Sequence, residues 1–296
     1  MKTSCCWMYA ITKYGFPPST DNCFQALQDM ARLGFAYVEM EGVGEENMRA
    51  VHRRRRELRQ RASDLGLSFV NFCPVQPAII DMDPTIQRLG LEMFDLGIET
   101  ALELGSQMIQ LNSYTPPLRF TGQAPYREGN WYGREYHVVI EPGFSWPRFW
   151  EHFVGVVRAC NAKAKAAGLR MTIEPRVGET VSNTDALLRI FDAVGDDNLG
   201  AVLDTAHLHG QKEILPLSVE KLGRRIFYVH AADNDSTTNA HRALGQGTID
   251  WEGLMAALRK QGFDGYIALD MGQVPDADRD YAASKVIMEK LISGAA

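Results

Sequence analysis

Hydrophobic residues along the chain gather in short runs that alternate with longer amphipathic stretches. Eight of the runs are brief and nearly continuous, as parallel strands buried on both faces should be. Each run is expected to form one strand of a common sheet. The expected strands are Ser4–Tyr9, Ala36–Glu41, Leu67–Val75, Met108–Ser113, Arg170–Glu174, Leu199–Asp204, Ile226–Ala231 and Tyr266–Asp270.

The stretches between these runs have the spacing of helices that bury one face. In Trp150–Ala167, for example, Phe153, Val157, Cys160 and Ala164 share one face. Most of these stretches end at a glycine, the residue that most readily adopts the left-handed conformation that ends a helix. The expected helices are Asn22–Leu33, Glu46–Leu65, Pro84–Leu104, Trp150–Ala167 and Asp250–Gln261.

This alternation, repeated about eight times, predicts an α/β protein whose parallel strands close into a (β/α)8 TIM barrel. The main alternative is an open, doubly wound sheet, which normally carries a glycine-rich phosphate-binding turn after its first strand. The segment after Tyr9 reads AITKYGFPPST and has no such turn, which favours the barrel. A barrel needs about 250 residues, so we expect one domain, 1–296, with one long insertion.

The insertion is expected at about 114–147, directly after the fourth strand. It is rich in proline, glycine and aromatic residues, including Tyr126, Trp131 and Tyr132, and the aromatic residues argue against disorder. Loops of this length inside a compact domain are usually functional or disordered, and barrels place their active sites where strands end. The insertion is therefore interpreted as a substrate lid or a partner-docking surface, with a packed excursion as the alternative.

Charge and cysteine content narrow the possible partners. The chain has 31 Lys and Arg residues against 37 Asp and Glu residues, a formal net charge of −6. This balance favours neither nucleic acid nor an anionic membrane surface, and no apolar run approaches the roughly 18 residues of a membrane span. The five cysteines lack the paired spacing of a disulfide framework or a thiolate zinc site. We expect a cytoplasmic protein that binds neither nucleic acid nor membrane.

Polar residues stand at the ends of the last four predicted strands. Glu174 ends the fifth strand, Asp204 the sixth, His230 lies at the end of the seventh, and Asp270 ends the eighth. A single such residue is often a helix cap or a buried core residue. Four of them on adjacent strands of one barrel, however, reach the same rim. Carboxylates with one imidazole are the donor set of a hard or borderline divalent ion such as Mn²⁺, Mg²⁺ or Co²⁺.

Further motifs carry a resemblance to a known family. Asp204 and His207 form an Asp-x-x-His step, and His230 is followed by Asp233. The segment 241–251 reads HRALGQGTIDW and places a Gly-x-Gly-x-Ile-Asp-Trp phrase before a predicted helix. Together with Glu174, these motifs resemble the xylose isomerase-like barrels, also called the sugar phosphate isomerase/epimerase superfamily. The resemblance covers nearly the whole chain.

The resemblance implies one divalent cation, Mn²⁺ before Mg²⁺ or Co²⁺, and assigns roles to residues of this chain. Its ketose epimerases use the carboxylates of strands five and eight both as metal ligands and as acid/base groups. Three further side chains and position 40, which is Met40 between two glutamates, are implied as substrate contacts. The implied metal ligands are Glu174, Asp204, His230 and Asp270; the acid/base groups are Glu174 and Asp270; the other substrate contacts are His207, Arg176 and Arg242, with a salt bridge to another barrel residue as the alternative for Arg176.

The chemistry expected of such a site is proton abstraction next to a carbonyl. A divalent ion chelated by a carbonyl and a neighbouring hydroxyl acidifies the adjacent C–H and stabilises the enediolate. A carboxylate removes the proton, and a second carboxylate returns it from the opposite face. Return to the same carbon gives epimerisation, and return to the next carbon gives isomerisation.

Two departures from the epimerase pattern leave a lyase open. The strand-eight ligand is usually Glu, whereas Asp270 is one methylene shorter, so its reach to the substrate carbon is in question. The Pro-Arg-Val-Gly-Glu sequence at 175–179 and the aromatic insertion are similar to the large subunits of C-glycoside deglycosidases. That branch implies β-elimination from a 3-oxo-glycoside, a small partner subunit, and His137 in the insertion as a catalytic acid or base.

Two other functions are weighed against these. Abasic-site endonucleases share the barrel. Their pattern, however, is a site that binds several metal ions and uses more histidine ligands than this sequence offers. A non-catalytic sugar-binding or scaffold protein would not need the full ligand set. A small-molecule sugar or glycoside is the expected substrate. We expect a homo-oligomer, or a complex with a small partner subunit if the protein is a lyase.

Overall fold

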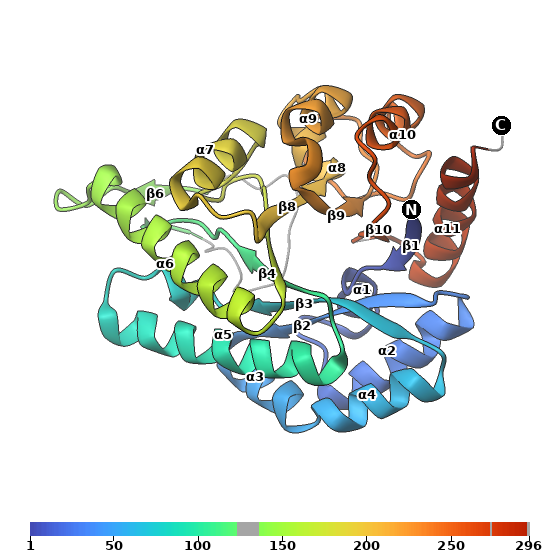
Figure 1. Ribbon diagram of the computed structural model, residues 1–296, viewed down its shortest axis with the longest axis horizontal. Coiled ribbons are helices and arrows are strands. Elements are labelled where there is room, and N and C mark those ends of the chain that lie inside the picture. Colours follow the sequence, from blue (N-terminus) through green and yellow to red (C-terminus); the bar gives the residue numbers. More distant parts are fainter. Residues whose placement is uncertain (123–135, 273, 295–296) are drawn as a thin grey trace.

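The computed structural model describes residues 1–122, 136–272 and 274–294, which form a closed parallel barrel surrounded by helices (Figure 1). The strands follow the order β1-β10-β9-β8-β7-β4-β3-β2 around the barrel. Every neighbouring pair is parallel, as the strand–helix alternation predicts. The barrel strands are β1 (Lys2–Cys5), β2 (Tyr37–Val43), β3 (Ser68–Val75), β4 (Met108–Asn112), β7 (Arg170–Glu174), β8 (Leu199–Asp204), β9 (Ile226–Ala231) and β10 (Tyr266–Leu269).

Helices follow the strands and cover the outside of the barrel (Figure 1). In the described parts of the chain, the short 3₁₀ turns η1 (Pro77–Ile80) and η2 (Gly223–Arg225) lie between them. The helices are α1 (Met8–Tyr14), α2 (Thr20–Arg32), α3 (Gly44–Arg53), α4 (Arg55–Asp64), α5 (Pro84–Leu104), α6 (Trp146–Ala166), α7 (Thr184–Val194), α8 (Thr205–Gly210), α9 (Leu215–Leu222), α10 (Trp251–Lys260) and α11 (Ala277–Ser293). The (β/α)8 barrel predicted from the sequence is thus confirmed.

Several predicted elements are shifted by one to four residues at an end, and two of the differences have a clear physical reason. The first strand ends at Cys5, not Tyr9, because the backbone N–H of Trp7 leaves the ladder and donates to the Glu39 carboxylate at the barrel mouth. The helix expected over Glu46–Leu65 is broken at Arg54, whose backbone lies at φ −100° and ψ 10°. The break places the Arg54 guanidinium over the Phe24 ring of α2, 4.3 Å from its centroid.

The insertion after β4 is described only at its two ends. There, β5 (Arg119–Phe120) pairs antiparallel with β6 (Val138–Val139), and the rings of Phe120 and Tyr136 meet edge to face at 5.9 Å. The aromatic residues of its middle, Tyr126, Trp131 and Tyr132, lie outside the described residues. The lid and docking interpretations of this segment therefore stay predictions.

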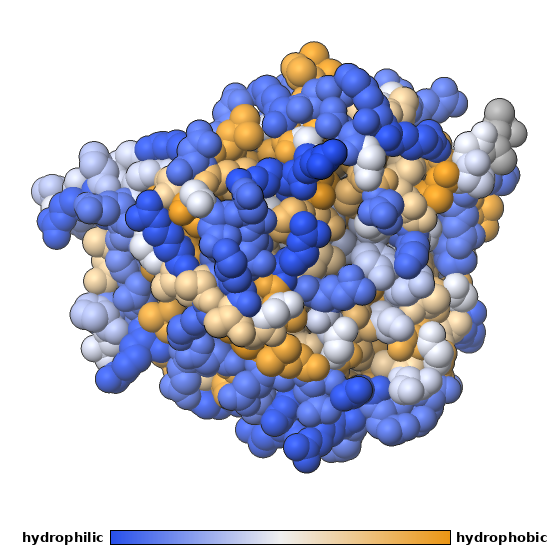
Figure 2. All heavy atoms as spheres, viewed as in Figure 1, coloured by the Kyte–Doolittle hydropathy of each residue, from blue (hydrophilic) through white to orange (hydrophobic). Residues whose placement is uncertain are grey.

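Apolar side chains fill the space between the barrel and the helices. The interior of the barrel is polar toward the carboxyl ends of the strands. The buried polar side chains include Glu39 on β2, Asn71 on β3, Gln110 on β4 and His230 on β9. All five cysteines are free and buried. On the face shown in Figure 2, polar residues predominate and apolar ones form separate patches. Among the described residues, no helix has both the length and the apolar character of a membrane span.

Candidate active site

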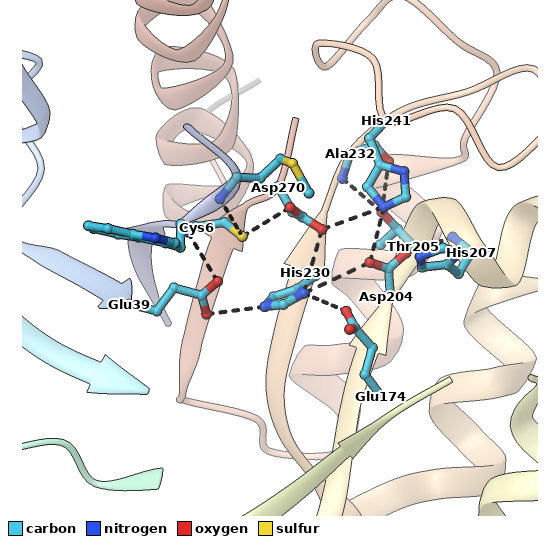
Figure 3. Close-up of polar contacts among 12 residues, drawn as sticks. Cys6, Glu39, Glu174, Asp204, Thr205, His207, His230, Ala232, His241 and Asp270 are labelled. Carbon is cyan, nitrogen blue, oxygen red and sulfur yellow. Dashed lines mark hydrogen bonds and ion pairs between the residues drawn. The ribbon is translucent and has the colours of Figure 1, made fainter. Parts of the chain in front are cut away.

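Four side chains converge at the carboxyl ends of adjacent strands (Figure 3). Glu174 and Asp204 are the last residues of β7 and β8, His230 lies near the end of β9, and Asp270 directly follows β10. The strand register sets Asp204 beside His230. Each of the four offers one ligand atom, and these atoms all lie within 4.8 Å of one another in a fully buried cluster. The fold therefore brings together the four residues that the sequence singled out.

His230 stands at the centre of this cluster. Its Nδ1 lies 2.6 Å from Oε1 of Glu174, 3.6 Å from Oδ2 of Asp270 and 3.9 Å from Oδ2 of Asp204. On the other side of the ring, Nε2 lies 3.2 Å from Oε2 of Glu39. A ring with a carboxylate at each nitrogen donates from both nitrogens, so His230 is an imidazolium when only protons occupy the cluster.

The pKa values follow from burial and from this charge pattern. Burial opposes protonation of His230, but Glu39 and Glu174 outweigh it and raise its pKa well above the usual range. Burial raises the pKa of Glu174 above its usual range, against the opposing charge of His230. Burial also opposes ionisation of Asp204, yet the charges of His207 and His241 keep its pKa low. The cluster thus holds several buried carboxylates that need positive charge.

The residues fit a divalent cation. Three carboxylates and one imidazole form a donor set of hard oxygens and one borderline nitrogen. Oδ2 of Asp204 is buried and accepts no hydrogen bond among the described residues, although buried polar atoms are nearly always satisfied. A cation at the centre of the cluster would neutralise the charge of this oxygen, which lies 3.4 Å from Nε2 of His241.

A closed ring of hydrogen bonds supports two of the four side chains. Glu174 Oε2 accepts from Gln110 Nε2 at 3.1 Å, and Gln110 Oε1 accepts from Asn71 Nδ2 at 2.9 Å. Asn71 Nδ2 also donates to Oε2 of Glu39 at 3.3 Å. His230 contacts both Glu39 and Glu174, which closes the ring. The ring joins five strands and fixes the orientation of both Glu174 and His230.

Asp270 is held by the segment after β1. The thiol of Cys6 donates to Oδ1 of Asp270 at 2.9 Å, and the backbone N–H of Met8 donates to the same sulfur at 3.4 Å. Burial, reinforced by the negative charge of Asp270, raises the pKa of Cys6 well above its usual range, so the thiol keeps its proton. Oδ1 of Asp270 is therefore occupied by a donor, and Oδ2 faces the cluster.

Arg176 and His207 lie beside Glu174. The Nε of Arg176 is 3.7 Å from Oε2 of Glu174, 3.8 Å from Oε1 of Glu179 and 3.3 Å from Nε2 of His207. The backbone N–H of Val177 approaches Nδ1 of His207 at 3.3 Å. Arg176 thus lies beside two carboxyl groups of the barrel, in line with the salt bridge that is the alternative to substrate binding. The roles of Arg176 and His207 as substrate contacts stay predictions.

Asp233 holds the 241–251 segment in place through hydrogen bonds. Oδ2 of Asp233 accepts from the backbone N–H of Gly245 at 2.9 Å and from the indole N–H of Trp251 at 3.2 Å. The backbones of Asp233 and Arg242 also pair with each other. This places His241 against the cluster, whereas the Arg242 side chain is half-exposed and pairs with Asp235 at 2.9 Å. Substrate binding by Arg242 stays a prediction.

Position 40 was assigned wrongly as a substrate contact. Met40 is fully buried in the apolar core, because alternate residues of a strand point to opposite faces. The acidic neighbours Glu39 and Glu41 face the site instead. Glu39 is 3% exposed, and burial and the charge of Glu39 raise the pKa of Glu41 to about 8. A charged residue inside an otherwise apolar strand was the available signal for Glu39.

His137 lies at the described edge of the insertion, next to β6. It is exposed, and its backbone carbonyl accepts from Thr121. In the described parts of the chain, no hydrogen bond or ion pair links its side chain to the cluster, so a catalytic role for His137 stays a prediction.

A family model described as xylose isomerase-like TIM barrel matches residues 27–290. The chain belongs to this family. A curated relative, uncharacterized protein MJ1311 of Methanocaldococcus jannaschii, is 24% identical over 246 residues, which are 79% of this chain and 73% of that protein. The inosose isomerase of Bacillus subtilis is 28% identical over 127 residues, 40% of this chain and only 45% of the relative.

Solved structures with the same fold include sugar epimerases. The apo form of the 3-keto-D-glucoside 4-epimerase YcjR from E. coli has a TM-score of 0.76 at 18% identity, covering 98% of this chain and 99% of its own. The IolI protein, solved with a bound zinc atom, has a TM-score of 0.73 at 17% identity and covers 99% of both chains. At these identities the similarity establishes the fold, and the chemistry must be argued from the residues.

Proposed function

We propose that this protein is a divalent-metal-dependent sugar isomerase or epimerase that removes a proton from the carbon next to a carbonyl. The observation that carries the proposal is the buried convergence of Glu174, Asp204, His230 and Asp270 at the carboxyl ends of four adjacent strands. The relatives named as sugar isomerases and epimerases within the same fold support it. Mn²⁺ is the ion that we expect, since oxygen donors predominate in the cluster.

The four residues would hold the ion, with His230 binding through Nδ1. When bound, the ion polarises the substrate carbonyl and acidifies the neighbouring C–H. His230 must lose its Nδ1 proton to become a ligand, while Nε2 keeps its proton and continues to donate to Glu39. The carboxylate of Glu39 thus fixes the tautomer of His230 that a metal ligand requires.

Glu174 is the base in this proposal. Its two oxygens have different neighbours: Oε1 faces His230, while Oε2 faces Gln110 and lies 3.7 Å from Arg176. Oε2 accepts the proton from the substrate carbon. In the metal-free cluster, burial raises the pKa of this carboxyl above its usual range.

Asp270 has less freedom than Glu174. Its Oδ1 is occupied by the Cys6 thiol and its Oδ2 faces two imidazoles, so it acts mainly as a ligand. The return of the proton from the opposite face would need movement of Asp270 or another donor. The choice between isomerase and epimerase, the lyase alternative with its small subunit, the cytoplasmic location and the homo-oligomer all stay predictions.

Exchange with solvent tests the proposal. We expect metal-loaded protein in D₂O to place deuterium on the carbon next to the carbonyl of at least one sugar from a panel of ketoses, 3-keto-glycosides and inososes. Glu174→Gln should slow the exchange by about 10²–10⁴-fold, the range for a general base, whereas Glu103→Gln on the outer helix α5 should leave it unchanged. Absence of exchange with the whole panel, or equal exchange by Glu174→Gln, would overturn the proposal.

A further inference from the structure

Two oxygens of the cluster each lie between two imidazole rings (Figure 3). Oδ2 of Asp204 is 3.9 Å from Nδ1 of His230 and 3.4 Å from Nε2 of His241. Oδ2 of Asp270 is 3.6 Å from the same nitrogen of His230 and 3.5 Å from the same nitrogen of His241. Nε2 of His241 is therefore at least as close to these two carboxylate oxygens as Nδ1 of His230 is.

The tautomer of neutral His241 is determined by its backbone contact. Nδ1 lies 2.8 Å from the carbonyl oxygen of Asn239, which can only accept, so Nδ1 carries the proton. Nε2 then has a lone pair, and it points at the two carboxylate oxygens. The ring is buried, with 1% of its side chain exposed, so bulk water does not screen the repulsion between the Nε2 lone pair and the two carboxylate oxygens. A positive charge must lie between them, either a proton or a metal ion.

The spacing suits a metal ion. With metal–ligand bonds of about 2.1 Å, two ligands of one ion are separated by about 3.0 Å at a right angle and about 4.2 Å when opposite. The four separations between these carboxylate oxygens and imidazole nitrogens, 3.4, 3.5, 3.6 and 3.9 Å, all fall in that range. Oδ2 of Asp204, buried and without a hydrogen bond among the described residues, is aimed into the same space.

A separate ion bound by His207 is disfavoured. Asp204, His207 and His241 also lie close enough to share one ion. Each ring nitrogen of His207, however, faces an N–H donor: Nε2 faces Arg176 at 3.3 Å and Nδ1 faces the backbone of Val177 at 3.3 Å. A cation bound to His207 would be repelled by the positive charge of Arg176. We therefore consider His241 together with the cluster of Glu174, Asp204, His230 and Asp270.

We propose that His241 is a fifth protein ligand of the metal ion and would bind it through Nε2. The inference rests on the metal centre of the proposed function and adds a residue to it. Asp233 holds the loop that presents His241, through the backbone pair with Arg242 and the bond to Gly245. Two imidazoles and three carboxylates leave less room for substrate oxygens than four ligands do, which favours a substrate that chelates through few atoms.

Counting the coordinated imidazoles tests this without any variant. The probe is Mn²⁺ alone, added to protein that carries ¹⁵N-labelled histidine, with electron spin echo modulation as the readout. We expect two histidine nitrogens coupled to the ion. A single coupled nitrogen would overturn the inference and leave the metal centre intact, whereas no bound Mn²⁺ at all would overturn the proposed function as well.

The matched variants are His241→Gln and His209→Gln. His209 lies on the neighbouring helix α8, where its Nδ1 is 2.7 Å from Asn234 Oδ1 and outside the cluster. We expect His241→Gln to lose one coupled nitrogen and to bind Mn²⁺ more than tenfold less tightly in a direct titration. His209→Gln should retain both nitrogens and the original affinity. Unchanged affinity in a folded His241→Gln protein would contradict the assignment; if that variant does not fold, the count in the unaltered protein decides.

Discussion

At the scale of single residues, the most consequential side chain outside the ligand set is Glu39. It is 3% exposed, and its Oε2 lies 3.2 Å from Nε2 of His230. Carboxylates that accept from the second nitrogen of a ligating histidine typically change metal affinity by 10–100-fold when they are removed. The same carboxylate is fixed by Asn71 and by the backbone of Trp7, so it cannot readily turn away.

Glu39→Gln should therefore weaken Mn²⁺ binding by about 10–100-fold, because the neutral amide no longer favours the protonated Nε2 of His230. Calorimetric titration of metal-free protein measures this directly. Glu46→Gln is the control, since Glu46 is exposed on α3 and forms no hydrogen bond with His230 among the described residues. Equal affinities of the unaltered protein and Glu39→Gln would show that Glu39 does not set the state of His230.

Glu179 offers a test of burial alone. Its Oε2 accepts from Ser113 and from the backbone of Tyr114, whereas its Oε1 accepts no hydrogen bond among the described residues. Arg176 lies 3.8 Å from that oxygen. Burial raises the pKa of Glu179 to about 8, while a glutamate in the unfolded chain ionises near pH ~4.3.

Between these two values the unfolded chain has released this proton and the folded protein retains it. Rising pH therefore favours unfolding, by up to about 1.4 kcal/mol per pH unit from this group, and the effect ends above its folded pKa. Glu179→Gln should remove that slope in denaturant unfolding of metal-free protein, whereas Glu289→Gln on α11 should retain it. A slope unchanged by Glu179→Gln would mean that the carboxyl is ionised in the folded state.

At the scale of elements, two helix glycines should respond in opposite directions to alanine. A methyl group at Gly90 of α5 would lie 2.3 Å from the backbone nitrogen of Ile79 in η1, whereas one at Gly155 of α6 would have no neighbour within 4 Å. Gly90→Ala should destabilise the fold by about 1–3 kcal/mol. Gly155→Ala should stabilise it by about 0.5–1 kcal/mol. Urea unfolding compares the two, and equal effects would contradict the observed packing of α5 on η1.

The elements also show how far the sequence leads. The strands Arg170–Glu174, Leu199–Asp204 and Ile226–Ala231 and the helix Pro84–Leu104 were predicted at their observed bounds, because apolar runs and glycine stops mark them. Their ends carry three of the four cluster residues, so the chemistry of the site was visible in the strand pattern.

The rest of the site depends on contacts between distant segments. Cys6 meets Asp270 across the join of the first and last strands, and Glu39 meets His230 across the barrel. Which residue of a strand faces inward depends on the register of its neighbours, and β2 carries a register shift between Val38 and Glu39. Hydrophobic patterning alone does not contain that shift.

At the scale of the whole molecule, the cluster should couple metal binding to stability. Its ligands come from four strands, so an ion that binds only the folded state stabilises the entire barrel. Mn²⁺ at 100 times its dissociation constant should raise the free energy of unfolding by about 2.7 kcal/mol, and a chelator should reverse the gain. Thermal unfolding of His230→Gln should not respond to the same addition, and an equal rise in that variant would place the ion elsewhere.

The central claim is that one divalent ion binds among Glu174, Asp204, His230 and Asp270, and a crystal structure of Mn²⁺-loaded protein tests it most directly. Anomalous scattering recorded above and below the manganese absorption edge identifies the ion by element and by position. The account predicts one strong manganese peak at the carboxyl ends of β7 to β10, in contact with all four side chains. A fully loaded crystal with no manganese peak there, or with its peak bound by other residues, would contradict it.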